Sequence, residues 1–153
     1  MPSTGETTQG GRSAPTLRQA LSGYVQSRSR ALDEARRTLN IGEGDARAML
    51  HIADNPGIRP TQLREYLNIT SAGVTALIDR LEDRDVVRRD VDPLDRRVSR
   101  ITLTIDLEKD PWVSLTRFDT RFDEAVTTMD AADMGRFADS LVVLTRMSVG
   151  TAS

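Results

Sequence analysis

The sequence predicts a mainly α fold with one small β-hairpin, of the α+β class. Apolar residues recur at intervals of three and four over most of the chain, which is the spacing of amphipathic helices. Two short β-branched runs, at residues 86–91 and 98–107, bracket an Asp-Pro turn that is typical of a hairpin. With 153 residues, 38% of them hydrophobic, the chain is long enough for one domain with a substantial core and too short for two large ones.

Composition excludes several classes of function. The chain has no cysteine, which excludes disulfides, iron–sulfur clusters and thiolate zinc sites, and its single histidine, His51, argues against a histidine metal site. No phosphate-binding glycine loop, nucleophile elbow or catalytic carboxylate pair occurs at usable spacing, so we expect neither an enzyme nor a cofactor. No run of about 18 apolar residues and no charged-then-apolar leader occurs, so we expect a cytoplasmic protein without membrane contact.

The N-terminal part of the chain divides into a tail and a long helix. Residues 1–15 are Gly, Ser, Thr and Pro with almost no apolar side chain, which predicts a disordered tail. Over residues 16–40 the apolar positions recur at three, four and seven, which predicts a long amphipathic helix ending near Asn40. We expect a single domain over residues 16–149.

Two shorter helices follow. The first is expected over residues 45–54, and the second over residues 60–67, where Pro60 and Thr61 begin it. Asn68 is expected to end the second helix in the left-handed conformation. The predicted inward side chains of the two helices are Ala46, Met49, Leu50 and Ala53, then Leu63, Tyr66 and Leu67.

A fourth helix is predicted over residues 71–84, with Thr70 or Ser71 as its cap. Small outer residues on its first half would let the helix backbone approach a DNA major groove closely. The inward set is Val74, Leu77, Ile78 and Leu81, and the outward set is Ser71, Ala72, Thr75, Ala76, Asp79 and Arg80.

The hairpin comes directly after this helix. Pro93 suits the turn between the two strands, and apolar residues at every second position from Ile101 to Leu107 give the second strand one buried face.

Helices are also predicted over residues 110–148. Asp110 and Pro111 are expected to begin the first of them as cap and first residue, and Asp130 to cap the last. The apolar stripes of these helices and of residues 16–40 exceed what the small central unit can cover. We therefore expect them to pair with each other and with a second subunit.

The order of two helices, a strand, an arginine-bearing turn and a second strand is that of a winged helix-turn-helix, which binds DNA. The turn is not a basic patch, because residues 79–100 hold as many acids as arginines. One alternative is a solvated turn in which Asp92 and Asp95 neutralise Arg96 and Arg97. The order of the elements favours DNA contact over that alternative.

Three segments resemble a known family. TQLREYLNI, SAGVTALIDRLEDRDVVRR and DPLDRRVSRITLT resemble the MarR/SlyA family of transcriptional regulators over about residues 45–104, and D-P-x-D-R-R followed by x-L-T is the most specific part. The resemblance implies a homodimer with interleaved terminal helices (residues 16–40 and 110–148) and two winged helix-turn-helix lobes (residues 45–107). It implies binding to double-stranded DNA at a pseudo-palindromic operator, and a repressor that a small phenolic or lipophilic effector releases.

The resemblance also assigns roles to single residues. Arg97 is the counterpart of the wing-tip arginine that enters the minor groove, Arg96 is its neighbour at the backbone, and Asp95 is the aspartate that pins the wing by pairing with an arginine. Arg64 and Arg80 would lie near phosphates. The base-facing part of the recognition helix corresponds to Ser71, Ala72, Gly73, Thr75 and Ala76.

The sequence departs from the family at two places. Asp85 stands where a Gly usually ends the recognition helix, and Asp adopts the left-handed conformation less readily. The continuation LTIDLEKDP lacks the family's Gly, which predicts a longer second strand.

An effector would bind in the crevice between the lobe and the dimerisation helices. A structural role in the core or an interface fits each candidate residue equally well. The candidates are Tyr24, Arg28, Arg47, Met49 and His51.

A function of another class is also open, namely a winged-helix protein-interaction module that does not bind DNA. Such a module has no reason to expose Arg96 and Arg97, so the wing tip distinguishes the two functions.

Overall fold

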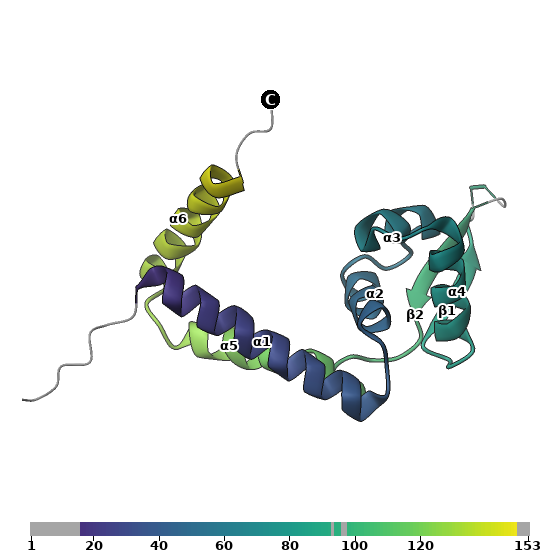
Figure 1. Ribbon diagram of the computed structural model, residues 1–153, viewed down its shortest axis with the longest axis horizontal. Helices are drawn as coiled ribbons and strands as arrows, with labels where there is room; N and C mark the ends of the chain where they lie inside the picture. Colours follow the sequence, from purple (N-terminus) through teal and green to yellow (C-terminus); the bar gives the residue numbers. More distant parts are fainter. Residues whose placement is uncertain (1–15, 93, 96–97, 150–153) are drawn as a thin grey trace, which may run out of the picture.

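The computed structural model describes residues 16–92, 94–95 and 98–149. Within these ranges the chain is mainly α with one two-stranded hairpin, as predicted (Figure 1). The predicted N-terminal tail, Pro93, Arg96 and Arg97 lie outside the described residues. The elements are α1 (Leu17–Leu39), α2 (Glu43–Asp54), α3 (Pro60–Leu67), α4 (Ser71–Glu82), β1 (Val87–Val91), β2 (Ser99–Leu103), the 3-10 helix η1 (Trp112–Leu115), α5 (Arg117–Thr127) and α6 (Ala131–Val149).

Capping side chains and a left-handed residue define the ends of α1. The Thr16 hydroxyl accepts from the Gln19 backbone N–H at 3.3 Å, and the Gln19 side chain accepts from the Thr16 N–H at 2.9 Å, which together form a capping box. Asn40, at φ 50°, ends the helix as predicted, and the Ile41 N–H donates to Arg36 O.

A lobe made of α2, α3, α4, β1 and β2 surrounds the core. β1 and β2 are antiparallel, with Val87 opposite Leu103 and Arg89 opposite Ile101. Ile101 also exchanges hydrogen bonds with the segment before α3, since its carbonyl accepts from Gly57 N at 3.0 Å and its N–H donates to Ile58 O at 2.8 Å. The hairpin is thereby fixed to α2 and α3. The largest fully buried side chains are Met49, Ile52, Leu63, Ile78, Leu81, Val86 and Ile101.

The terminal helices form an arm apart from the lobe. α1 and α5 lie side by side, and α6 projects away from them (Figure 1). No residue of α5 or α6 is buried in the single chain. The large exposed apolar side chains of the arm are Leu17, Val25, Phe122, Met129, Phe137, Val142, Val143, Leu144, Met147 and Val149.

The prediction of a long second strand is wrong, because β2 ends at Leu103. β1 begins at Val87, and the last backbone bond between the two segments runs from Thr104 N to Val86 O at 3.0 Å. Beyond Thr104 no strand partner remains. Ile105 and Leu107 still pack against the core, as their alternation predicted.

The prediction that Asp110 and Pro111 begin an α-helix is also wrong. The chain forms η1 first, and α5 begins only at Arg117. Leu115 is buried in the lobe core, and the Thr116 hydroxyl donates to Leu107 O at 3.2 Å, so the chain stays against the lobe before it turns into α5.

Two predicted inward side chains point outward. Ala53 is exposed, and α2 instead buries Ala48 and Ile52 beside Ala46 and Met49. Tyr66 is 45% exposed, because its ring stacks on a side chain of α2 rather than entering the core.

Candidate nucleic-acid interface

The turn between α3 and α4 is fixed by two local features. Asn68 has φ 53° and ends α3 in the left-handed conformation, as predicted. The Thr70 hydroxyl then accepts from the Gly73 backbone N–H at 3.0 Å and caps α4. The start of α4 is therefore set by its own sequence.

The outer face of α4 has the composition predicted for a recognition helix. Ser71, Ala72, Thr75 and Ala76 are exposed, Gly73 is half-buried, and the four predicted inward residues are all buried. The Thr75 hydroxyl donates to Ser71 O at 3.0 Å, so it lies along the helix instead of projecting from it. The first half of α4 thus presents a low, small-residue surface.

The hairpin runs back along α4. Arg89 of β1 forms ion pairs with Asp79 and Glu82, the second at 2.7 Å. Because these acids lie in the second half of α4, β1 leads from there toward the beginning of that helix. The Val91–Ser99 end of the hairpin and the first half of α4 therefore lie on the same side of the lobe (Figure 1).

A buried carboxylate holds the base of the wing. Asp92 is 3% exposed and accepts from Leu94 N at 2.9 Å and from Arg100 Nε at 2.7 Å. The Leu94 N–H and then the Arg100 guanidinium lower the pKa of Asp92 below its ordinary value of 3.8. Arg100 also donates to Gly57 O at 3.1 Å, which ties the wing to the loop before α3.

The Asp92 carboxylate binds Arg100, while the alternative in which Asp92 and Asp95 neutralise Arg96 and Arg97 concerns arginines outside the described residues. The backbone carbonyl of Asp95 accepts from Val98 N at 2.9 Å. Its pairing with Arg97 stays a prediction, since Arg96 and Arg97 lie outside the described residues.

The two arginines predicted near phosphates have protein partners. Arg64 donates to the Ser71 hydroxyl at 3.3 Å and lies 3.7 Å from Glu65. Arg80 binds both carboxylate oxygens of Asp45, and this hydrogen bonding raises the pKa of Arg80. Asp45 is 4% exposed. Sequence reasoning missed this pair because an acid in the first turn of a helix is usually a solvated N-terminal charge.

Three of the predicted effector residues meet in one crevice, and two do not. Arg28, Arg47 and His51 line a crevice of about 540 Å³ between α1 and α2. Met49 lies in the core, and the Tyr24 ring packs against two phenylalanines of α5.

Aromatic and charged contacts hold the side chains that line this crevice. The His51 and Tyr66 rings stack at 3.6 Å between centroids, and the Arg47 guanidinium lies 5.6 Å from the Tyr66 centroid. Arg28 is held by both oxygens of Asp119 of α5 at 2.7 Å, and this bonding raises the pKa of Arg28. The crevice is therefore lined by both flat rings and cationic groups.

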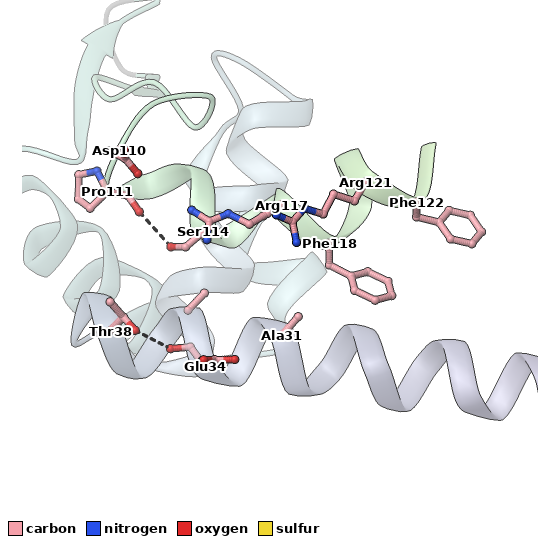
Figure 2. Close-up of a pocket in the computed structure, with 11 residues that line it drawn as sticks. Ala31, Glu34, Thr38, Asp110, Pro111, Ser114, Arg117, Phe118, Arg121 and Phe122 are labelled. Carbon is pink, nitrogen blue, oxygen red and sulfur yellow. Dashed lines mark hydrogen bonds between the residues drawn. The ribbon is translucent and has the colours of Figure 1, made fainter. Parts of the chain in front are cut away.

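A second groove, of about 650 Å³, separates α1 from α5. Glu34 and Thr38 lie on its α1 side, and Arg117 and Arg121 lie on its α5 side (Figure 2). Sequence reasoning did not single out this groove, because it depends on how two helices far apart in the chain cross.

The described part of the chain has no helix with the length and apolar character needed to span a membrane, and no cluster of three potential metal ligands.

Comparison with known proteins matches the lobe to a family. A sequence model described as the MarR family matches residues 39–98, which include α2, α3, α4 and the hairpin. The lobe is therefore similar in sequence to the winged helix-turn-helix of the MarR family. The curated protein "Transcriptional regulator HosA" of Escherichia coli O111:H- is 41% identical over 61 residues, which are 40% of this chain and 45% of HosA. The chain thus matches less than half of the length of this relative.

MarR-family structures extend the likeness in fold to the arm. A MepR mutant of S. aureus bound to an oligodeoxyribonucleotide has a TM-score of 0.56 at 18% identity, over 90% of this chain and 100% of that one. MepR bound to ethidium bromide has a TM-score of 0.62 at 16% identity, over 89% and 98%. Wild-type MarR of E. coli in the apo form has a TM-score of 0.57 at 19% identity, over 87% and 98%. The shared fold includes the terminal helices.

Proposed function

We propose that this chain is a homodimeric, DNA-binding transcriptional regulator that represses from a pseudo-palindromic operator. One observation carries the proposal: the small, exposed first half of α4 and the Val91–Ser99 end of the hairpin lie on the same side of the lobe. A duplex against that side would receive α4 in its major groove and the wing in the adjacent minor groove.

The distribution of charge on the lobe is consistent with recognition of DNA by a few projecting arginines. Arg80, Arg89 and Arg100 are each bound to carboxylates of the protein, so the charges of these three arginines are already paired within the lobe. Arg96 and Arg97 occupy the turn of the wing in the sequence. An arginine there gains from the negative potential of a narrow minor groove, which favours A·T-rich or easily compressed steps.

The exposed arm supports a second copy as the partner. The side chains of Leu17, Leu21, Val25 and Leu144 line an open groove of about 630 Å³ between α1 and α6. Apolar surface of this extent is unusual on a monomer and is covered in a symmetric dimer, in which each copy supplies the same face.

A small effector is the proposed ligand of the crevice between α1 and α2. The stacked His51 and Tyr66 rings suit a flat phenolic or lipophilic molecule. The dimer can adopt conformations that differ in the angle between lobe and arm. A ligand that binds one of these conformations more tightly would shift the dimer toward it and change the spacing of the two lobes.

Selection of binding sites from a pool of random duplex DNA tests the proposal. We expect a recovered site with two related half-sites, salt-sensitive gel shifts and a weaker shift for Arg97→Ala. Arg136→Ala on α6, where Arg136 pairs with Asp133, is the matched control with unchanged binding. No shift by the wild-type protein, with the pool or with its own upstream DNA, would contradict the proposal and favour the protein-interaction module.

A further inference from the structure

The junction of α1 and α2 lies against the C-terminal end of α4. We call residues 39–45 the elbow, because α1 ends there and α2 begins there. Leu39 and Ile41 of the elbow are buried in the same core as Leu77 and Leu81 of α4. The elbow is therefore the place where the arm meets the recognition helix.

Arg84, in the turn after α4, binds the end of α1. Its Nη1 donates to Asn40 O at 3.0 Å and its Nη2 donates to Leu39 O at 3.1 Å. The last carbonyls of a helix lack partners within the helix and carry its negative partial charge. A guanidinium is suited to this place, because its planar fork can bond two neighbouring oxygens.

Arg80, one helical turn before Arg84, binds the other side of the elbow. It donates to both carboxylate oxygens of Asp45, whose side chain is almost fully buried. A buried carboxylate that loses its only ion-pair partner is strongly unfavourable, so this contact resists separation. Arg80 and Arg84, at the C-terminal end of α4, thus bind the elbow at two points, Asp45 and the carbonyls of Leu39 and Asn40.

We propose that Arg80 and Arg84 are positioning residues that fix the angle between the recognition helix α4 and the dimerisation helix α1. The buried Leu39 and Ile41 anchor the elbow in the core, and the two arginines add directional hydrogen bonds at its two ends, at residues 39–40 and at Asp45. This inference rests on the proposed function, because α1 belongs to the dimer arm and α4 to the DNA-binding surface. It gives Arg80 a role different from a phosphate contact.

A distance measurement within one chain tests the positioning role directly. The chain has no cysteine, so Ser27→Cys on α1 and Thr61→Cys on α3 carry the two spin labels of a pulsed dipolar experiment. Labelled protein is diluted with unlabelled protein so that only distances within a chain contribute. We expect a narrow distribution for the parent protein and a shifted or broadened one for Arg84→Met and for Asp45→Asn.

The matched control is Arg37→Met, which removes an exposed arginine from the last turn of α1. We expect the parent distribution for this variant. Arg84→Lys keeps the charge without the fork, and it serves as the second variant if Arg84→Met does not fold. Parent-like distributions for the folded elbow variants would overturn the proposal.

DNA binding separates positioning from phosphate contact. On a selected duplex with two half-sites, we expect Arg84→Met and Asp45→Asn to lose affinity within the roughly 5- to 150-fold range of coupling between sites. The salt dependence should stay unchanged, whereas losing a phosphate contact lowers its slope by about 1. Unchanged affinity, or a loss accompanied by a lower slope, would overturn the proposal. If the parent protein binds no duplex, the proposed function fails, and the distance measurement still decides the link between α1 and α4.

Discussion

Buried carboxylates are the charged residues that matter most for the lobe. Exposed ion pairs such as that of Arg88 and Asp90 contribute about 0–1 kcal/mol each, because solvent screens them. Asp45 and Asp92 are different, since both are nearly inaccessible and each accepts from an arginine of another segment. Each of these two acids joins an element of the proposed DNA-binding surface to the rest of the molecule.

Replacing Asp85 by Gly should stabilise the protein. Asp85 has φ 55°, a left-handed conformation that costs a side-chain-bearing residue about 1–2 kcal/mol. The greater chain entropy of unfolded Gly offsets part of that gain, which leaves about 0.5–1 kcal/mol. Urea unfolding measures the change. Asp83→Gly is the matched control at φ −59°, where Gly should lower the stability, and equal changes for both variants would contradict the reason given.

Asp92→Asn should make stability less dependent on pH. The folded pKa of Asp92 is lowered by the Leu94 N–H and the Arg100 guanidinium, so its stabilisation is present above the unfolded pKa of about 4. That stabilisation is lost as the pH falls through the folded value. The parent protein should therefore be more stable than Asp92→Asn near neutral pH, and the difference should shrink below about pH 4. A constant difference in denaturant unfolding across this range would show that ionisation is not the cause.

At the scale of elements, local sequence decides where α4 begins and how the hairpin leaves it. The Thr70 cap and the left-handed Asn68 fix the turn before α4. The ion pairs of Arg89 with acids of α4 then direct β1 back along the helix. The proposed DNA-binding surface is thus assembled from neighbouring segments of the chain.

The cap of α4 contributes measurable stability. Thr70→Ala removes the acceptor of the Gly73 N–H and should cost about 1 kcal/mol in the free energy of unfolding. Thr70→Ser keeps the acceptor and should retain most of that stability. Chemical denaturation compares the two variants, and equal losses would show that the hydroxyl is not the stabilising group.

The elements themselves were predictable from the sequence, because spacing and capping are local properties. α1, α4 and the left-handed Asn68 follow the prediction. The second strand and the start of α5 do not, since they depend on where β1 begins and on the burial of Leu115.

The pairing of charges within the candidate site was not predictable. Asp45 and Arg80 are 35 residues apart, and they lie in different helices, so the periodicity of one helix does not relate them. Helical spacing indicates which face is buried but leaves the partner of a buried acid open. The groove between α1 and α5 was missed for the same reason, since it depends on a crossing between helices far apart in sequence.

At the scale of the whole molecule, the lobe is joined to the arm (Figure 1). The lobe has its own core, whereas large apolar side chains of the arm are exposed. The lobe is the part that the MarR family model matches, together with the last residue of α1. The arm carries the surface proposed for a second copy, and the elbow connects the arm to α4. Dimerisation and DNA binding are therefore expected to depend on each other through α1.

Leu144→Glu should weaken the proposed dimer. Leu144 lies on the apolar side of α6 and faces the groove with α1. Burial of a Leu side chain contributes about 1.5–3 kcal/mol, and a symmetric interface carries the change twice, so the loss should reach about 3 kcal/mol or more. Sedimentation equilibrium measures the dissociation constant. Arg146→Glu, two positions along α6 and not among the residues that line this groove, is the control, and equal weakening by both would contradict this interface.

The central claim is that α4 and the wing bind DNA through arginine contacts in both halves of a dimer. Fluorescence anisotropy of a selected duplex against salt concentration tests it most directly. A dimer with about 6–10 phosphate contacts predicts a slope of log K against log salt concentration of about −5 to −9. Arg97→Ala should bind more weakly at every salt concentration. Absence of binding at low salt, or affinity that does not change with salt, would contradict the claim.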